Sequence, residues 1–415
     1  MKMEKLFNED VMALDTYIMV KLKEKTAQLK DKLTQKNRAP ISLSMGAPTS
    51  APPAILVDKL KEFLTEDNIH SYSVTRGESY FREACAKRMK NRFGVDINPV
   101  DEVCSILGSK DGLANLIRFL INPKHDEFEK DIILVPDPGY ASYSQMVGCS
   151  GGTAYSMPLK PENNYQPDME EVLEQLKNDG YDENKIKAVV INYPNNPLGV
   201  NASKEYVQSV IDFCKKHDFL LISDAAYCDM YYDENDKPFS IFELKGAKDI
   251  AVEMFTLSKS YAITGWRLGW VCGNSEVVSR FAKGKSTIDN GIFKALQKAC
   301  SYIMTSSDGD DFIKSENIAY KRKQSILIKG LKELGWNIED SQIPKTTFYL
   351  WLPVPPRYSS SVKFCEEMLE KSGIVVVPGS AFGKYGEGYF RISYVCSDEK
   401  LKEVIERMKS DGFRF

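Results

Sequence analysis

The sequence predicts an α/β protein with a large domain, built on a mainly parallel central sheet sandwiched by helices, and a smaller α+β domain. Short apolar runs typical of buried strands alternate with amphipathic stretches typical of helices, which is the pattern of a parallel sheet. A chain of 415 residues also exceeds what one simple core fills. After about residue 300 the alternation stops. We expect the large domain at residues 46–305 and the smaller one at residues 1–45 and 306–415.

The net charge, the cysteine pattern and the lengths of the apolar runs exclude several classes of function. The net charge of −3 is close to neutral for this length, which argues against nucleic acid or an anionic membrane as the main partner. The nine cysteines are scattered, without C-x-x-C or zinc spacing, so we expect no metal and a reducing compartment. The metal-like stretch from His125 to Lys130 is interpreted as solvated charge. No signal-peptide block and no run of about 18 apolar residues occurs, so a cytoplasmic protein is expected.

The first part of the chain predicts an exposed helix followed by the start of the globular fold. Apolar residues at helical spacing, from Leu14 to Leu29, predict a helix that packs one face on another element. A Gly/Pro-rich loop at Gly46 follows, where glycine lets a ligand or another backbone approach closely. The elements expected here are that helix, a short strand from Ile41, and helices at 53–63 and 79–92 around a loop at 70–78.

The middle of the chain predicts strands that each end near a polar or aromatic side chain. The expected strands lie at 103–107, 131–135, 188–192, 219–227, 251–257 and 268–272, with helices at 113–120 and 203–217. The side chains at the ends of these strands are Ser109, Tyr140, Asn196, Asp224 and Lys259. Because ligands bind beyond the carboxyl ends of parallel strands, we expect these side chains to surround one site.

Two stretches in this region have the chemistry of an anion site and of a reactive amine. A turn of small residues at 108–112 precedes a helix, whose N–H groups and dipole favour an anion, although a plain capped turn looks the same. Burial of Lys259 would lower the pKa of its amine and make it a nucleophile towards pyridoxal phosphate (PLP), the commonest protein-bound aldehyde. Thr256, Ser258 and Arg267 would suit the PLP phosphate. Taken alone, such a lysine is more often a surface residue, so the rest of the chain decides.

The last third of the chain predicts the smaller α+β domain, which we expect the N-terminal segment to join. A long helix opens it, with an apolar face at Leu327, Leu331 and Leu334. The expected elements are a helix at 313–334, a strand at 347–353, a helix at 361–371, strands at 374–377 and 389–394, and a helix at 398–409.

Taken in order, these stretches resemble the class I and II aminotransferases, PLP enzymes of fold type I, from about Ile41 to the last helix. The motifs that carry the resemblance are Gly108-Ser109-Lys110-Asp111-Gly112, Asn195-Asn196-Pro197-Leu198-Gly199, Asp224-Ala225-Ala226-Tyr227, Ser258-Lys259-Ser260 with Arg267-Leu268-Gly269, and Phe390-Arg391-Ile392-Ser393. One of these motifs alone is weak, whereas all of them in this order argue against coincidence.

The resemblance implies a role for each side chain near the cofactor ring. Lys259 would hold PLP as a Schiff base and, once freed by the substrate, would move the proton between substrate Cα and cofactor C4′. Asp224 would pair with the protonated pyridine nitrogen and so keep the ring an electron sink. Asn196 and Tyr227 would hydrogen-bond O3′ of the ring, and Tyr140 would stack on its face.

The resemblance also implies which residues hold the phosphate and the substrate. The phosphate ligands would be Ser109, Lys110, Ser258 and Arg267, with Thr256 as a further candidate. Arg391 would bind the substrate α-carboxylate through two parallel hydrogen bonds, with Asn196 and the backbone of Gly46 beside it. Tyr72 matches the family tyrosine that reaches the phosphate of the neighbouring subunit, which implies a homodimer with shared active sites.

Within the family, the segments at 108–113 and 285–295 look most like the branch labelled LL-diaminopimelate aminotransferase. Enzymes with these segments also act on aspartate, alanine and other amino acids. The implied reaction is a two-stage ping-pong: an L-amino acid donates its amino group to PLP, and a 2-oxo acid, in the first instance 2-oxoglutarate, takes it. The sequence names no residue that reads the distal end of the substrate.

Two other functions stay open at this point. A PLP-dependent C–S β-lyase would carry the same motifs, because the reaction depends on how the bonds at Cα are oriented to the ring. A non-catalytic PLP-binding regulator would need an added DNA-binding domain, and the roughly 38 residues before the first strand are too few for a winged helix.

Overall fold

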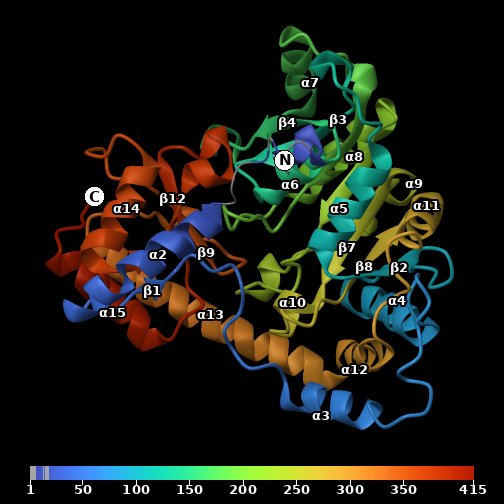
Figure 1. Cartoon of the computed structure of the whole chain (residues 1–415), viewed down its shortest axis with the longest axis horizontal. Helices are drawn as coiled ribbons and strands as arrows, with labels where there is room; N and C mark the ends of the chain where they lie inside the picture. The colour runs from blue at the N-terminus through green and yellow to red at the C-terminus, as the bar shows by residue number, and fades with distance from the viewer. Residues whose placement is uncertain (1–5, 13, 15–17) are drawn as a thin grey trace.

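The computed structural model describes residues 6–12, 14 and 18–415 and contains the expected α/β architecture (Figure 1). Within the described residues, a seven-stranded sheet has the order β2-β8-β7-β6-β5-β3-β4. Its strands are β2 (Val103–Ile106), β3 (Ile132–Asp137), β4 (Thr153–Pro158), β5 (Ile186–Ile191), β6 (Leu220–Asp224), β7 (Ala251–Thr256) and β8 (Gly269–Gly273). Neighbours from β4 to β7 pair in parallel, whereas β8 is antiparallel to β7 and β2. The prediction of a mainly parallel sheet is confirmed.

Helices cover both faces of this sheet, because its strands are apolar on both sides. Along β7, Val252 and Met254 face one core while Ala251 and Phe255 face the other, as a period of two requires. One core is closed by α5 (Ser109–Leu120), α6 (Ser142–Cys149) and α11 (Ser275–Lys285). The other is closed by α3 (Ala54–Phe63), α4 (Ser79–Phe93), α7 (Met169–Asn178), α8 (Lys204–Lys216) and α12 (Lys294–Thr305).

Residues from both ends of the chain build a further core, at the left of Figure 1. Its strands are β1 (Ile41–Ser42) with β10 (Ile374–Val375), and β11 (Val377–Pro378), β12 (Tyr389–Ser393) and β9 (Tyr349–Pro353). Its helices are α13 (Ser307–Glu333), α14 (Ser361–Ser372) and α15 (Asp398–Ser410), while α2 (Ile18–Gln35) packs beside it in two small clusters through Leu22 and Leu33. The parallel pairing of β1 with β10 ties the N-terminal segment to the C-terminal part. The domain boundaries at residues 45 and 305 stay a prediction.

Two helices begin earlier than the sequence pattern indicates. α13 begins at Ser307 because the side chain of Ser306 accepts a hydrogen bond from the Gly309 N–H and so caps the helix. α5 begins at Ser109, directly after Gly108, so the small-residue turn is the first turn of the helix rather than a loop before it. The apolar pattern misses both turns because their side chains are small or polar.

The strands also differ from expectation in places. β4 is not predicted, because this edge strand is only half-buried and lacks an apolar run. The strand expected at 374–377 is split between β10 and β11, which pair with different neighbours. The strand expected at 219–227 ends at Asp224. The N-terminal helix expected from Leu14 is observed from Ile18, and residues 13 and 15–17 lie outside the described part of the chain.

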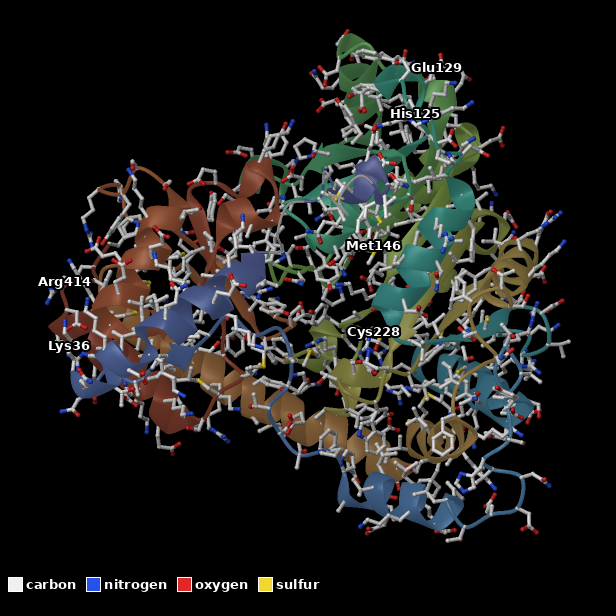
Figure 2. The ribbon with its side chains drawn as sticks, viewed as in Figure 1. Lys36, His125, Glu129, Met146, Cys228 and Arg414 are labelled. Atoms are coloured by element: carbon white, nitrogen blue, oxygen red, sulfur yellow. The ribbon has the colours of Figure 1, made fainter. Side chains whose placement is uncertain are left out.

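Short helices and turns complete the chain. They are α1 (Glu9–Met12), α9 (Ala247–Ile250), α10 (Leu257–Ser260) and 3-10 turns at Glu127–Glu129, Pro161–Asn163, Glu183–Lys185, Glu234–Asp236, Ile241–Glu243, Asp340–Gln342, Gly379–Phe382 and Lys384–Gly386. None of the described helices is long and apolar enough to cross a membrane. Across the same residues, no group of three or more His, Cys, Asp or Glu side chains is placed to hold a metal ion. Glu129, labelled near the top of Figure 2, forms an ion pair with Lys185.

One carboxyl group, that of Glu253, is buried inside an apolar layer. It lies in the middle of β7 and is 1% exposed. It accepts hydrogen bonds from the hydroxyls of Ser223 and Ser240, at 3.0 and 2.5 Å. Burial raises its pKa to about 7, although these hydrogen bonds act in the opposite direction. The folded protein therefore holds a proton on Glu253 under conditions in which the unfolded chain has released it.

We predict that this proton makes the protein less stable as the pH rises from about 4.5 to about 7. The free energy of unfolding should lose on the order of 3 kcal/mol over that range, at about 1.36 kcal/mol per pKa unit. Glu253→Gln mimics the protonated form and should remove this part of the loss. Urea unfolding at pH 5 and pH 8 measures it, with the exposed Glu234→Gln as control. Equal pH dependence in wild type and Glu253→Gln would contradict the prediction.

Candidate active site

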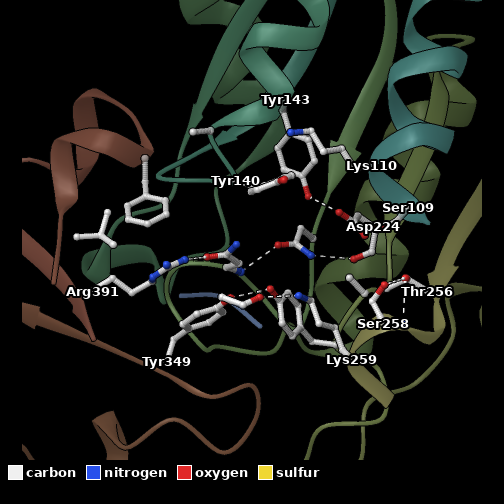
Figure 3. A pocket seen from close by; sticks show the side chains of 18 of the residues that line it. Ser109, Lys110, Tyr140, Tyr143, Asp224, Thr256, Ser258, Lys259, Tyr349 and Arg391 are labelled. Atoms are coloured by element: carbon white, nitrogen blue, oxygen red, sulfur yellow. Dashed lines mark hydrogen bonds between the residues drawn. The ribbon is translucent and has the colours of Figure 1, made fainter. Parts of the chain in front are cut away.

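The side chains expected to form the site surround one cavity of about 240 Å³ (Figure 3). The predicted residues that line it are Gly46, Ser109, Lys110, Tyr140, Asn196, Asp224, Tyr227, Thr256, Ser258, Lys259, Arg267 and Arg391. Most of them come from the carboxyl ends of the parallel strands, while Gly46 and Arg391 come from the core built by the chain ends. Tyr72 does not line the cavity and is 84% exposed. The structure thus brings together every candidate except Tyr72.

Lys259 reaches the cavity from α10, the short helix that follows β7. Its Nζ donates a hydrogen bond to the carbonyl oxygen of Gly46. Burial, followed by the positive charges of Arg267 and Arg391, lowers the pKa of this amine to about 8, although Asp224 acts in the opposite direction. With this pKa, roughly a tenth of the amine is uncharged at pH 7, and this is the form that attacks a carbonyl or accepts a proton.

Asp224 ends β6 and is 4% exposed. Its Oδ2 accepts a hydrogen bond from the Tyr143 hydroxyl at 2.7 Å, while its Oδ1 has no hydrogen-bond partner among the described residues. Burial raises its pKa to about 6, although Tyr143, the Ala226 N–H and Lys259 act in the opposite direction. A buried carboxylate oxygen without a donor is costly. This side of the cavity therefore fits a ligand group that carries a proton, such as a protonated ring nitrogen.

Asn192, directly after β5, links Asp224 to the opposite side of the cavity. Its Nδ2 donates to the carbonyl oxygen of Asp224 at 2.8 Å, and its Oδ1 accepts from the N–H of Asn196 at 3.0 Å. The Oδ1 of Asn196 in turn accepts from Nη1 of Arg391 at 2.7 Å. One path of hydrogen bonds therefore runs from the Asp224 backbone to Arg391, as the dashed lines in Figure 3 show.

A positively polarised corner of the cavity is formed by the start of α5 and Arg267. Gly108, with φ of +84°, precedes α5, and no side chain caps its first turn. The Arg267 guanidinium donates to the carbonyl oxygen of Leu107 at 3.0 Å and to the hydroxyl of Ser258 at 3.3 Å. The hydroxyl of Thr256 bonds that of Ser258 at 3.0 Å. Helix N-termini and guanidinium groups both favour anions, so this corner fits a phosphate.

Arg391 lies in β12 and is 4% exposed. Besides its bond to Asn196, its Nη2 donates to the carbonyl oxygen of Ser44 at 2.7 Å, and its Nε finds no partner within the described chain. The guanidinium lies over the rings of Tyr349 and Phe382, at 4.3 and 4.8 Å from their centroids. A guanidinium held in this way presents its remaining N–H groups in a fixed plane, which suits a carboxylate.

Tyr227 and Gly46 meet at Tyr349. The hydroxyls of Tyr227 and Tyr349 are 2.8 Å apart, and burial raises the pKa of Tyr227 well above its ordinary value. A Cβ at position 46 would overlap the Tyr349 hydroxyl, so glycine fits there without displacing that ring. Tyr227 is therefore held in its neutral, hydrogen-bonding form.

The sequence pattern misses Tyr143, Asn192, Tyr349 and Phe382, which also line the cavity. Tyr143 follows Tyr140 at helical spacing, and their rings meet edge to face at 5.5 Å, so this spacing was a usable signal. Asn192 is the last residue of the strand expected at 188–192, and it was a usable signal because a polar side chain at a strand end was the pattern that indicated Asp224. Nothing in the sequence distinguishes Tyr349 and Phe382 from the other aromatic residues of their core.

Comparisons with known proteins extend this picture. The family model for aminotransferases of class I and II matches residues 38–408. LL-diaminopimelate aminotransferase 2 of Trichormus variabilis is 39% identical over 90% of this chain and 92% of its own length. LL-diaminopimelate aminotransferase of Halothermothrix orenii is 37% identical over 90% and 92%. The substrate-bound structure of BacF from Bacillus subtilis has a TM-score of 0.88 at 31% identity and covers 97% of each chain. A double mutant of Thermus thermophilus aspartate aminotransferase has a TM-score of 0.86 at 26% identity, over 98% of this chain and 99% of that one.

Gly108→Ala is predicted to weaken the binding of PLP by about tenfold, or about 1.4 kcal/mol. The added Cβ would lie 2.7 Å from Nη2 of Arg267, at a φ that disfavours a side chain, so the guanidinium must move away from the anion corner. The dissociation constant of PLP from the apoprotein, measured by fluorescence, tests this. Gly94→Ala is the matched control, because Gly94 also has a positive φ of +70° but an added Cβ meets no atom within 4 Å. Unchanged PLP affinity in Gly108→Ala would contradict the assignment of this corner.

Proposed function

This chain belongs to the class I and II aminotransferases, and we propose that it transfers the amino group of LL-diaminopimelate to 2-oxoglutarate as a cytoplasmic homodimer. It is a PLP-dependent enzyme that moves an amino group from an L-amino acid to a 2-oxo acid. One observation carries the proposal. A single cavity holds the amine of Lys259 with its lowered pKa, the buried Oδ1 of Asp224 and the guanidinium of Arg391.

The residues of this chain fit PLP and its chemistry. Bound PLP supplies an aldehyde that captures the substrate amine and a ring that delocalises the electron pair left when Cα loses its proton. The uncharged Lys259 amine would take that proton from Cα and return it at C4′ of the cofactor, on the other side of the nitrogen. Asp224 holds the ring nitrogen in its protonated form through charge and through its available Oδ1. Asn196 and Tyr227 offer hydrogen bonds to the ring oxygen.

Two further sets of side chains orient the cofactor and the substrate. Ser109, Lys110, Ser258 and Arg267, with Thr256 beside them, hold the phosphate at the start of α5. Arg391 holds the α-carboxylate of the substrate, with Asn196 and Gly46 at its side. Fixing the phosphate and the carboxylate at opposite ends sets the direction of the Cα–H bond. That direction decides which bond at Cα breaks.

The names of the curated relatives support LL-diaminopimelate as donor. The charged side chains that line the cavity in the described chain are Lys110, Asp224, Lys259, Arg267 and Arg391, and each already has a role in this proposal. The distal ammonium and carboxylate of LL-diaminopimelate would then meet residues of a second subunit.

An exposed apolar surface supports the homodimer. Tyr72 and Val74 lie on one loop, Ile288 and Phe293 on another, and they are 84%, 55%, 44% and 45% exposed. The loops touch, since the rings of His70 and Phe293 stack at 6.1 Å. Apolar side chains gathered on a surface in this way favour a protein partner. A second copy on this surface would bring its Tyr72 towards the phosphate, as the family pattern implies.

The absorbance spectrum of the purified protein, recorded with single amino acids and no acceptor, tests the proposed donor. Conversion of the bound-PLP band by LL-diaminopimelate, reversed by 2-oxoglutarate, is expected. Conversion by aspartate, alanine or an aromatic amino acid instead would replace the donor. Release of pyruvate and thiol from a cysteine conjugate without an acceptor would favour a C–S β-lyase. Light scattering at micromolar concentration measures the oligomeric state, and a monomer would contradict the dimer.

Lys259→Ala is predicted to lose the covalent attachment of PLP and nearly all turnover while keeping the fold. The reason is that the Lys259 amine lies buried in the cavity and its lowered pKa makes it a nucleophile. Borohydride trapping with mass spectrometry, the turnover rate and the melting temperature are the measurements. Lys283→Ala, which changes an exposed lysine of α11, is the control. Substantial transamination by Lys259→Ala would overturn the assignment.

Arg391→Ala is predicted to weaken donor binding by about 2–5 kcal/mol, the cost of removing one partner of a buried charged pair. PLP content should stay unchanged, since Arg391 lies away from the phosphate corner. Arg267→Ala should do the reverse and lower PLP content first. The KM of the donor and the PLP content of both variants test this. If Arg391→Ala lost PLP while its KM for the donor stayed the same, the two arginine roles would be wrong.

A further inference from the structure

Asp229 is a buried carboxylate next to α10 that does not line the cavity. It is 8% exposed and lies in the turn that follows β6, shortly after Tyr227. Figure 2 labels its neighbour Cys228, near the place of α10 in Figure 1. The chemistry described above does not use Asp229. A buried carboxylate is costly unless charges and hydrogen bonds compensate for the lost water, so its partners are informative.

The partners of Asp229 hold it in its charged form. Its Oδ1 accepts a hydrogen bond from Nη2 of Arg88 at 2.9 Å, and Nε of Arg92 lies 3.5 Å away. Its Oδ2 accepts from the hydroxyl of Ser260 at 2.7 Å. Burial opposes ionisation, but Arg88 and Arg92, together with these hydrogen bonds, hold the pKa of Asp229 below its ordinary value. Its carbonyl oxygen accepts from Nδ2 of Asn317 on α13 at 2.9 Å.

Ser260 connects this carboxylate to the catalytic lysine. α10 is a single turn, and Ser258 and Lys259 line the cavity whereas Ser260 does not. The bond to Asp229 therefore anchors the side of this helical turn that faces away from the cavity. A hydrogen bond to a charged acceptor is shorter and stronger than a neutral one, so it limits rotation of so short a helix.

The same carboxylate also belongs to the turn that carries Tyr227, and the strand before that turn ends in Asp224. The Asp229–Ser260 bond thus joins the two chain segments that carry Lys259 on one side and Asp224 with Tyr227 on the other. The backbone pairing of β6 with β7 ends at Asp224 and Met254, with one more backbone bond from the Ala225 N–H to the Met254 carbonyl oxygen. The relative position of the two turns then rests on side-chain contacts.

We propose that Asp229 is a positioning residue for Lys259: through Ser260 it sets the position from which the amine meets PLP and the substrate Cα. The proposal rests on the proposed role of Lys259 in the reaction. It predicts that loss of the Ser260 hydroxyl harms the chemistry of Lys259 more than it harms folding or donor binding.

The test compares Ser260→Ala, Ser260→Thr and Asp229→Asn with the wild type. The first measurement is the rate at which the apoprotein captures PLP covalently, trapped with borohydride. The second is the pH midpoint of the bound-PLP absorbance, and the third is kcat and KM for the donor. We expect Ser260→Ala to slow capture and lower kcat about tenfold, to shift the pH midpoint, and to leave KM and the melting temperature nearly unchanged. Ser260→Thr, which keeps the hydroxyl, should restore both rates.

Asp310→Asn is the matched control, because it breaks the 2.6 Å ion pair of Arg88 with Asp310 and leaves the Asp229–Ser260 bond in place. It should capture PLP at the wild-type rate. Wild-type capture by Ser260→Ala, or equal slowing in Asp310→Asn, would overturn the proposal. Asp229→Asn should show the same kinetic defects, together with a lower melting temperature, because it removes the carboxylate that pairs with Arg92 and leaves Arg88 with Asp310 alone.

Capture of PLP does not depend on which donor the enzyme uses. If the wild type captures PLP at Lys259 but converts no LL-diaminopimelate, the proposed donor fails while the capture rates still decide the role of Asp229. If the wild type captures no PLP, both proposals fail.

Discussion

The burial of the Lys259 amine is the constraint on which the rest of the site depends. Removal from water and the nearby charges of Arg267 and Arg391 leave its pKa at about 8. Asp224 is buried beside the same cavity, and its pKa moves the other way, to about 6. Burial thus makes Lys259 a weaker base and Asp224 a weaker acid. The lowered pKa of Lys259 suits a group that accepts and returns a proton near neutral pH, whereas Asp224 is still mostly charged at pH 7 and can stabilise a protonated ligand group.

The fold buries the Lys259 amine by bringing segments that are far apart in the sequence to the same cavity. β8 runs antiparallel to β7, which returns the chain past Lys259 and sets Arg267 against the turn at Gly108. Arg391 comes from β12, whose core also includes β1 and β10 from opposite ends of the chain. The hydrogen-bond path through Asn192 and Asn196 then connects this arginine to the β6 end. The candidate side chains of the cavity are thus held by hydrogen bonds to residues of other strands and helices, and several of those elements carry a candidate side chain themselves.

Sequence reasoning located most of the site because polar residues at strand ends are a local signal. Lys259 and Asp224 stand directly after apolar runs, and a parallel sheet places such positions at one edge. The same reasoning missed Tyr349 and Phe382, because an aromatic residue in a strand or turn looks like any other core residue. It also missed β4, whose half-buried residues lack an apolar run. Tyr72 is exposed in the single chain, so its predicted role depends on a partner surface.

The sequence by itself determined the α/β class, most strands of the central sheet and the candidate residues that line the cavity, because periodicity and motifs are properties of neighbouring residues. The tertiary structure alone decided the pKa values of Lys259 and Asp224, the bond between Arg391 and Asn196, and the bond between Asp229 and Ser260. Desolvation depends on everything packed around a group. A hydrogen bond between residues far apart in the chain depends on how the helices and strands pack together. Local sequence patterns therefore predict neither the pKa shifts nor these hydrogen bonds.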